Sequence, residues 1–122
     1  MTSTISSEQV LKAVEAARPA IERICAEVWD LAELSLEEVG SALVHRRELE
    51  QAGFTIISTG TAGEPTAFVA EWSQGVGGAR IGFLPEYDAL PGLGNAAVSR
   101  QQPWPMARPA ATAAATTYWV QA

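Results

Sequence analysis

The sequence is short of cysteine, histidine and long apolar runs. Its 122 residues include one cysteine and one histidine, and its formal net charge is −6. A single cysteine excludes an internal disulfide and suits a reducing compartment. The negative charge argues against nucleic acid or an anionic membrane as a partner. No apolar run approaches the roughly 20 residues that span a bilayer, and Met1–Ser7 lacks the features of a signal peptide. We expect a soluble, cytoplasmic protein.

The same scarcity limits the catalytic sites that the chain can build. Cys25 falls on the apolar stripe of a predicted helix, where we interpret it as a small buried thiol rather than a nucleophile. His45 lies in the polar stretch Val44-His-Arg-Arg-Glu-Leu, which we interpret as a solvated helix surface. The two residues are far apart in the chain, so they indicate neither a Cys–His site nor a zinc site rich in His and Cys.

Apolar residues at spacings of three and four predict a first amphipathic helix. Ser6 or Ser7 is suited to the N-cap position, and the apolar stripe continues to Leu34. Pro19 interrupts this pattern. We therefore expect either a kink there or a short first helix followed by a second that begins near Arg18.

A further helix is predicted over Leu36–Ala52. Its apolar positions Val39, Leu43 and Leu49 are expected to face inward. Gly53 follows directly and is suited to the cap position after the last turn, because glycine adopts a left-handed backbone without strain.

Three short β-rich runs follow the helices, at Phe54–Ser58, Pro65–Trp72 and Ala79–Leu84. The glycine-rich stretch Ser73–Gly78 predicts an antiparallel hairpin between the second and third strands. The order of elements indicates an α/β fold class, as the first layer of an α/β sandwich. The sandwich is expected to be incomplete, because the last strand ends where another helix should cover the sheet.

Two groups of carboxylates are candidates for function. Glu33, Glu37 and Glu38 could be paired acids, but acids near a helix start more often interact with the helix dipole. Glu86 and Asp88 follow an apolar strand, where α/β folds place ligand-binding groups. Residues two apart on an extended chain point the same way, so this pair could face a cation or orient a metal-bound histidine. From spacing alone, a polar strand end before a Pro-Gly turn is the favoured interpretation.

Four segments that follow one another in order favour a functional role for Glu86 and Asp88. They are Val28-Trp-Asp-Leu-Ala-Glu-Leu-Ser-Leu-Glu-Glu, Gln51-Ala-Gly-Phe, Gly63-Glu-Pro-Thr-Ala-Phe-Val-Ala and Gly82-Phe-Leu-Pro-Glu-Tyr-Asp-Ala-Leu-Pro-Gly-Leu. Together they resemble the N-terminal part of the M20 family of metal-dependent peptidases and amidohydrolases, in particular its aminobenzoyl-glutamate hydrolase branch. The resemblance covers roughly residues 8–97, and Glu-Tyr-Asp-Ala-Leu-Pro-Gly is its most specific part.

This resemblance implies a zinc-peptidase-like α/β sandwich that hydrolyses an amide bond. The substrate would be an N-acyl or aminobenzoyl amino acid or a dipeptide-like molecule, and the intact protein could be a homodimer. A divalent metal, zinc or manganese, would polarise the carbonyl and activate water, with a glutamate as general base. Asp88 occupies the family's metal-proximal aspartate position, which implies an orienting role. Glu86 stands where other branches carry a histidine ligand, which weakens its assignment as a ligand.

The family's next segment, Gly-His-Gly-Cys-Gly-His-Asn-Leu-Leu-Gly-Ala, is missing after this loop. The codons of Ala110–Gln121, read one base out of step, permit that segment at eleven successive positions. Its second Leu and following Gly are forced, because Tyr118-Trp119 must give Leu and Trp119-Val120 must give Gly. We therefore divide the chain into residues 1–97, the N-terminal portion of the catalytic domain, and residues 98–122, an out-of-frame tail. The isolated chain is expected to bind no metal and to be inactive; the alternative is a non-catalytic binding or dimerisation module.

The shifted reading frame makes a direct prediction about the gene. A one-base deletion or an equivalent slip should lie between the codons of about Asn95 and Trp104. Resequencing of the locus should show the Gly-His-Gly-Cys-Gly-His-Asn segment in another frame. A locus in which no frame encodes this segment would contradict the hypothesis.

Overall fold

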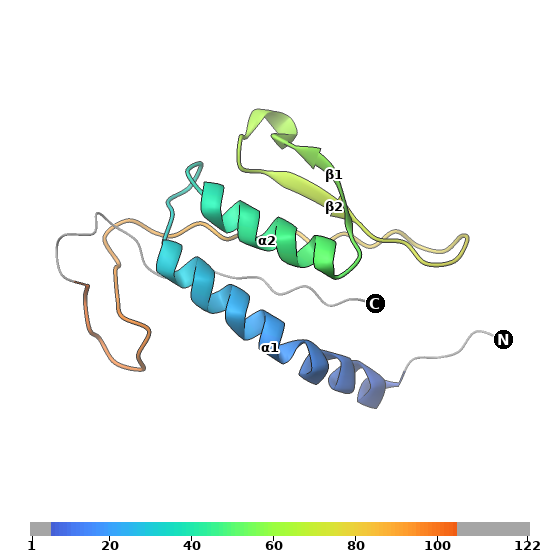
Figure 1. The fold of residues 1–122 in the computed structure, drawn as a ribbon, viewed down its shortest axis with the longest axis horizontal. Coiled ribbons are helices and arrows are strands. Elements are labelled where there is room, and N and C mark those ends of the chain that lie inside the picture. The colour runs from blue at the N-terminus through green and yellow to red at the C-terminus, as the bar shows by residue number, and fades with distance from the viewer. Residues whose placement is uncertain (1–5, 105–122) are drawn as a thin grey trace.

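The computed structural model of the chain describes residues 6–104. It contains the helices α1 (Ser7–Leu31) and α2 (Val39–Gln51), the strands β1 (Thr55–Thr59) and β2 (Phe68–Glu71), and a 3-10 turn at Thr61–Gly63. Helix α1 packs against α2, and α2 lies against the hairpin that β1 and β2 form (Figure 1). This mixed arrangement agrees with the predicted α/β class.

Helix α1 begins with a capping box. The Gln9 amide donates to the Ser6 hydroxyl, and the Ser6 amide donates to the Gln9 side chain. These two bonds satisfy backbone donors that the first helical turn would leave unpaired. The helix then continues through Pro19 as one element, so the predicted break with a new helix near Arg18 is wrong. Pro19 lacks the N–H that would bond to the Glu15 carbonyl, and its ring crowds that carbonyl, so the helix continues in spite of this residue.

The first turn of α2 is capped by a carboxylate from outside the helix. Glu33 Oε1 accepts from the Gly40 amide at 2.8 Å, and Oε2 accepts from the Ser41 amide and hydroxyl, each at 2.7 Å. A Cβ atom on residue 40 would lie 3.0 Å from both Glu33 Oε1 and a methyl of Leu31, so glycine permits this close approach. The expected role of Glu33 as a partner of a helix dipole is confirmed.

Helix α2 ends as its sequence predicts. Gly53 has a φ of 91°, and its amide donates to the Glu50 carbonyl at 3.0 Å. The next amide, of Phe54, donates to the Leu49 carbonyl at 2.9 Å. These two bonds form a Schellman motif, which turns the chain sharply from α2 into β1.

The strands β1 and β2 form an antiparallel two-stranded sheet with an irregular register between Ile56 and Ser58. Side chains alternate in burial along both strands, and the half-buried ones are Ile56, Ser58, Phe68 and Ala70. The hairpin predicted between Pro65–Trp72 and Ala79–Leu84 is wrong, because β2 pairs with β1 instead.

Residues 79–84 form no strand in the structure. The segment is exposed along its length, with Leu84 at 89%. Its β-rich composition matches a strand, but a strand also needs a ladder partner, and residues 79–84 pair with neither β1 nor β2. The third predicted strand is therefore wrong for the described part of the chain.

The core lies where α1, α2 and the segment after β2 meet. Its buried apolar residues are Val28, Ala42, Val44, Leu49 and Ala89. Leu49 faces inward as predicted, but Val39 and Leu43 are 62% and 53% exposed, so that part of the prediction is wrong. Helix α2 contacts both α1 and the hairpin, and these contacts bury the face that carries Ser41, Ala42 and His45 instead.

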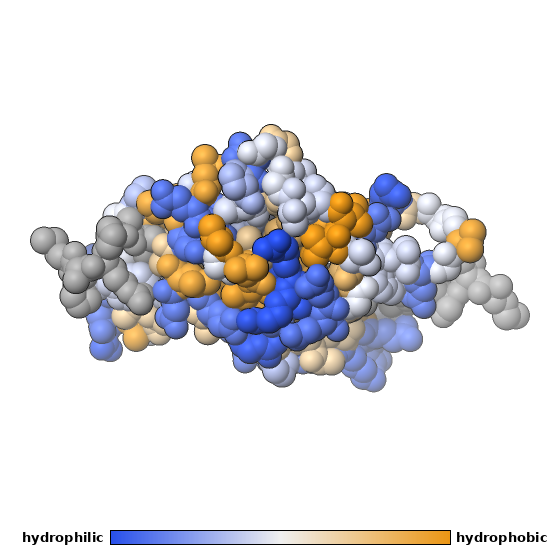
Figure 2. Space-filling model, turned by 45° about the horizontal axis from the view of Figure 1, so that its top comes forward, coloured by the Kyte–Doolittle hydropathy of each residue, from blue (hydrophilic) through white to orange (hydrophobic). Residues whose placement is uncertain are grey.

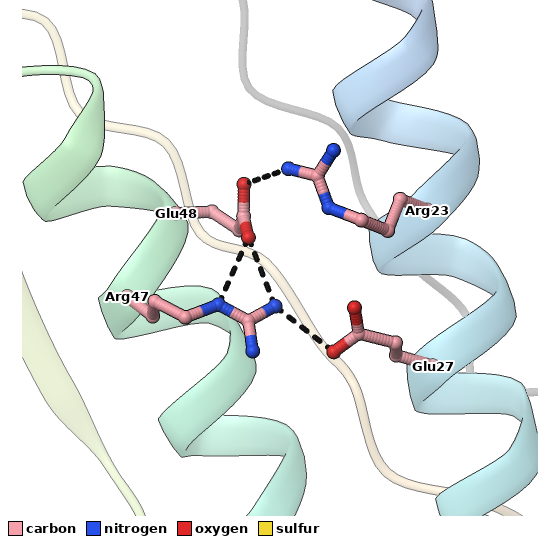
Figure 3. A network of polar contacts seen from close by, with 4 residues as sticks. All are labelled: Arg23, Glu27, Arg47 and Glu48. Atoms are coloured by element: carbon pink, nitrogen blue, oxygen red, sulfur yellow. Dashed lines mark hydrogen bonds and ion pairs between the residues drawn. The ribbon is translucent and has the colours of Figure 1, made fainter.

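A charged network joins the two helices along their polar edge (Figure 3). Arg23 and Glu27 project from α1 toward Glu48 and Arg47 on α2. Arg47 lies 2.9 Å from both carboxylates, and Arg23 pairs with Glu48. Burial alone would raise the pKa of Glu48, but hydrogen bonds from Arg47 and Arg23 outweigh it and lower that pKa. The network therefore helps to hold α1 and α2 in register.

Large apolar side chains also remain on the surface, where hydrophobic and hydrophilic residues lie side by side (Figure 2). They include Val10, Leu11 and Val14 on α1, and Ile57 and Val69 on the strands. Helix α2 covers only one face of the hairpin. The apolar side chains on the other face therefore stay exposed in the described part of the chain. In residues 6–104, no helix is long and apolar enough to cross a membrane.

Replacement of Glu33 by glutamine should destabilise the fold. The Glu33→Gln side chain loses the charge and one of the two accepting oxygens, so we expect the free energy of unfolding to fall by about 1–3 kcal/mol. Urea unfolding followed by circular dichroism measures this change. The matched control is Glu37→Gln in the same turn, where the side chain is exposed and the expected change is within about 0.5 kcal/mol. Equal losses in the two variants would contradict the capping role.

Candidate functional site

The candidate site is the segment that carries Glu86 and Asp88. After β2, the chain runs back past α2 to the turn between the helices (Figure 1). There the Ala89 amide donates to the Glu33 carbonyl at 2.8 Å, and Ala89 forms an isolated parallel bridge with Leu34. Ala89 is 1% exposed. The backbone is therefore fixed directly after Asp88.

Tyr87 fixes the same segment from its other side. Its hydroxyl donates to the Thr66 carbonyl at 2.8 Å. Its ring lies against the imidazole of His45, with 5.1 Å between ring centroids, and against Phe68 at 6.3 Å. These partners come from α2 and β2 and from the loop before β2, so one side chain ties the segment to three parts of the fold.

Tyr87 belongs to a buried polar group that we call the Tyr87 cluster, formed by Glu38, His45, Thr66 and Tyr87. Thr66 donates from its hydroxyl to Glu38 at 2.7 Å, and Glu38, His45 and Thr66 are all buried. Burial, and then the nearby Glu38 carboxylate, raises the pKa of Tyr87. Burial lowers the pKa of His45. Both shifts favour the neutral forms, which suits a closely packed interior.

Glu86 and Asp88 lie on either side of Tyr87. Glu86 is exposed, and Asp88 is partly buried. An extended segment alternates its side chains between opposite sides, so the inward Tyr87 leaves its two acidic neighbours on the other side. That Glu86 and Asp88 share one side of the segment therefore stays a prediction, as do their two roles.

The described residues do not fit a metal site. Nowhere in residues 6–104 do three or more His, Cys, Asp or Glu side chains gather closely enough to hold a metal ion. The sole histidine of the sequence is packed against Tyr87, and Cys25 lies half-buried on α1. Glu86 and Asp88 alone would supply only carboxylate oxygens, fewer than a closed zinc or manganese site needs.

The interpretation of His45 as a solvated surface residue is wrong. His45 is 4% exposed, and its Nε2 atom has no hydrogen-bond partner in residues 6–104. The polar neighbours Arg46 and Arg47 suggested a surface, but helical spacing gives the better signal. His45 lies three residues after Ala42 and four before Leu49, which puts it on the buried stripe. Cys25, expected in the core, is only half-buried.

Tyr87 and Thr66 were missed as site residues. Tyr87 stands between two acids, so the alternation that placed Glu86 and Asp88 on one side also placed Tyr87 on the other. Thr66 offers no comparable signal, because its role depends on a contact across 21 residues of sequence.

The chain after the site folds back on itself within the described residues. The Ala96 amide donates to the Gln102 carbonyl at 2.9 Å, and the Trp104 amide donates to the Gly94 carbonyl at 3.1 Å. The boundary expected at residue 98 lies inside this loop, and nothing in the loop tests it. The remainder of the expected out-of-frame tail, residues 105–122, lies outside the described residues.

Fold and site together define a small α/β unit with an anchored acidic loop. Comparison with curated proteins adds a particular relative, one of the subunits of p-aminobenzoyl-glutamate hydrolase from Escherichia coli (strain K12). It is 40% identical over 85 residues, which cover 70% of this chain and 17% of the relative. The match confirms the resemblance to the aminobenzoyl-glutamate hydrolase branch. No protein-family model and no solved structure matches the chain.

Proposed function

We propose that the chain is the N-terminal portion of an M20-type, metal-dependent amidohydrolase or peptidase. Such an enzyme would cleave the amide bond of an N-acyl or aminobenzoyl amino acid or a dipeptide-like substrate. The observation that carries the proposal is the 40% identity over 85 residues to the p-aminobenzoyl-glutamate hydrolase subunit. Because the match spans only 17% of that protein, the activity belongs to a longer polypeptide. A cytoplasmic location remains part of the proposal.

Two features of the fold support a portion of a larger catalytic domain. The acidic loop is anchored through Tyr87 and Ala89, as a loop that approaches a reaction centre requires. Apolar side chains such as Ile57 and Val69 remain on the uncovered face of the hairpin. A sheet with one uncovered apolar face is typical of a layer that packs against further elements.

The proposal assigns different parts of the chemistry to different parts of the polypeptide. Asp88 would orient groups near the metal, with Glu86 in a lesser supporting role. Residues beyond the acidic loop would supply the ligands for zinc or manganese and the general base. Since residues 6–104 contain no ligand set of three or more, the 122-residue chain is proposed to lack hydrolase activity.

A second candidate is a non-catalytic binding or dimerisation module. The apolar residues Val10, Leu11 and Val14 on α1 favour it, because they are exposed on one helix of a chain that forms its own small core. This function would need neither a metal nor a substrate. It shares with the first proposal the expectation that the isolated chain has no activity.

Hydrolysis assays on two matched proteins separate these possibilities. One is the 122-residue chain, and the other carries a single base inserted between the codons of Asn95 and Trp104. Substrates are N-acetyl amino acids and p-aminobenzoyl-glutamate, with zinc or manganese added. We expect turnover only by the restored protein, with a loss of about 10- to 100-fold in its Asp88→Ala variant, as for other residues next to a metal site.

Three outcomes would count against the proposal. Turnover by the 122-residue chain would contradict its assigned inactivity. A restored protein that folds and binds metal but hydrolyses no amide would contradict the amidohydrolase assignment. A restored frame that ends at once in a stop codon would contradict the shifted-frame account and favour the binding module.

A further inference from the structure

Two anchors hold the acidic loop, and they lie only two residues apart. At Ala89 the anchor is the backbone bond of 2.8 Å to the Glu33 carbonyl. Glu33 is itself immobilised, because its carboxylate accepts three hydrogen bonds from Gly40 and Ser41 at the start of α2. The Ala89 anchor is thus attached to a rigid helix start and not to a free loop.

At Tyr87 the anchor is a side chain. Its hydroxyl reaches the Thr66 carbonyl at 2.8 Å, and Thr66 is tied by its own hydroxyl to the buried Glu38 carboxylate at 2.7 Å. The ring is enclosed between His45 and Phe68. The hydrogen bond defines the direction of the side chain, and the ring contacts define its depth.

Asp88 is the one residue between these anchors. With the Tyr87 side chain directed inward and the Ala89 amide bonded, the backbone at Asp88 has little freedom to rotate. We infer that Tyr87 is a positioning residue, which sets the direction of the Asp88 carboxylate by locking the backbone beside it. The inference rests on the proposed function, because the direction of Asp88 matters only if the loop approaches a reaction centre.

The Tyr87→Phe variant isolates the hydroxyl. It keeps the ring contacts with His45 and Phe68 and removes only the bond to the Thr66 carbonyl. The first measurement is hydrogen exchange of backbone amides by NMR on the full chain. We expect the Ala89 amide to exchange roughly three to ten times faster, the loss that one hydrogen bond produces. The Phe54 amide at the end of α2 should keep its native rate.

The second measurement reports the Asp88 carboxylate itself. The sequence contains two aspartates, Asp30 and Asp88, so two side-chain carboxyl carbon-13 resonances are to be followed. In Tyr87→Phe the Asp88 resonance should move, and the Asp30 resonance on α1 should not. A merely structural tyrosine would change both resonances or neither. The matched control is Trp72→Phe, which alters the separate ring pair of Phe54 and Trp72 and should leave Asp88 unchanged.

The outcomes are decisive in either direction. A native Ala89 rate and a fixed Asp88 resonance in Tyr87→Phe would overturn the inference, as would an equal acceleration of the Ala89 and Phe54 amides. If Tyr87→Phe loses its helical circular dichroism, Thr66→Val replaces it as the test. It keeps the Thr66 carbonyl but removes the hydroxyl bond to Glu38 that holds this acceptor of the Tyr87 hydroxyl in place. The Asp88 resonance should therefore move while that of Asp30 does not, and an unmoved Asp88 would overturn the inference. Neither measurement needs turnover, so failure of the hydrolase assay is a separate result.

Discussion

One residue, Glu33, joins the start of α2 to the acidic loop. Its carboxylate satisfies the first amides of α2, and its carbonyl accepts the Ala89 amide of the acidic loop. Free amides at a helix start carry partial positive charge and need acceptors. Glu33 meets this need from outside the helix, since the N-cap residue Glu38 makes no capping bond with its own side chain.

Because the Glu38 side chain does not cap α2, its carboxylate can bond to a residue of the site. Its carboxylate turns to the Thr66 hydroxyl, and Thr66 in turn receives the Tyr87 hydroxyl at its carbonyl. The two glutamates thus have separate roles. Glu33 caps the start of α2, and Glu38 supports the Tyr87 cluster. The acidic loop depends on both, because its backbone is bonded to Glu33 and its tyrosine to the partner of Glu38.

The helices could be predicted from the sequence because their signals are local. Ser6 and Gln9 form a capping box within one turn, and α2 ends where the Gly53 and Phe54 amides donate to carbonyls three and five positions earlier, respectively. The strand over residues 79–84 could not be predicted correctly, because pairing depends on which segments meet in space. The burial of His45 was hidden by its charged neighbours, although its spacing from Ala42 and Leu49 places it inward.

The candidate site was predictable in part. Glu86 and Asp88 were found because they follow an apolar run and precede a Pro-Gly turn. What holds them was not found, since Thr66, His45 and Glu33 are brought to the loop only by the packing of α2 and the hairpin. The acids of the loop are thus visible in the sequence, and the anchors appear only in the fold.

The central claim is that the Tyr87 ring packs against a buried His45, and the single histidine makes this directly measurable. An NMR titration of the imidazole ring in the intact chain gives its pKa without assignment by mutation. Burial disfavours the charged ring, so the account predicts a pKa below the ordinary value of 6.5. Cross-peaks should also join the His45 and Tyr87 rings. A pKa at or above 6.5 without such cross-peaks, in a chain that keeps its helices, would contradict the account.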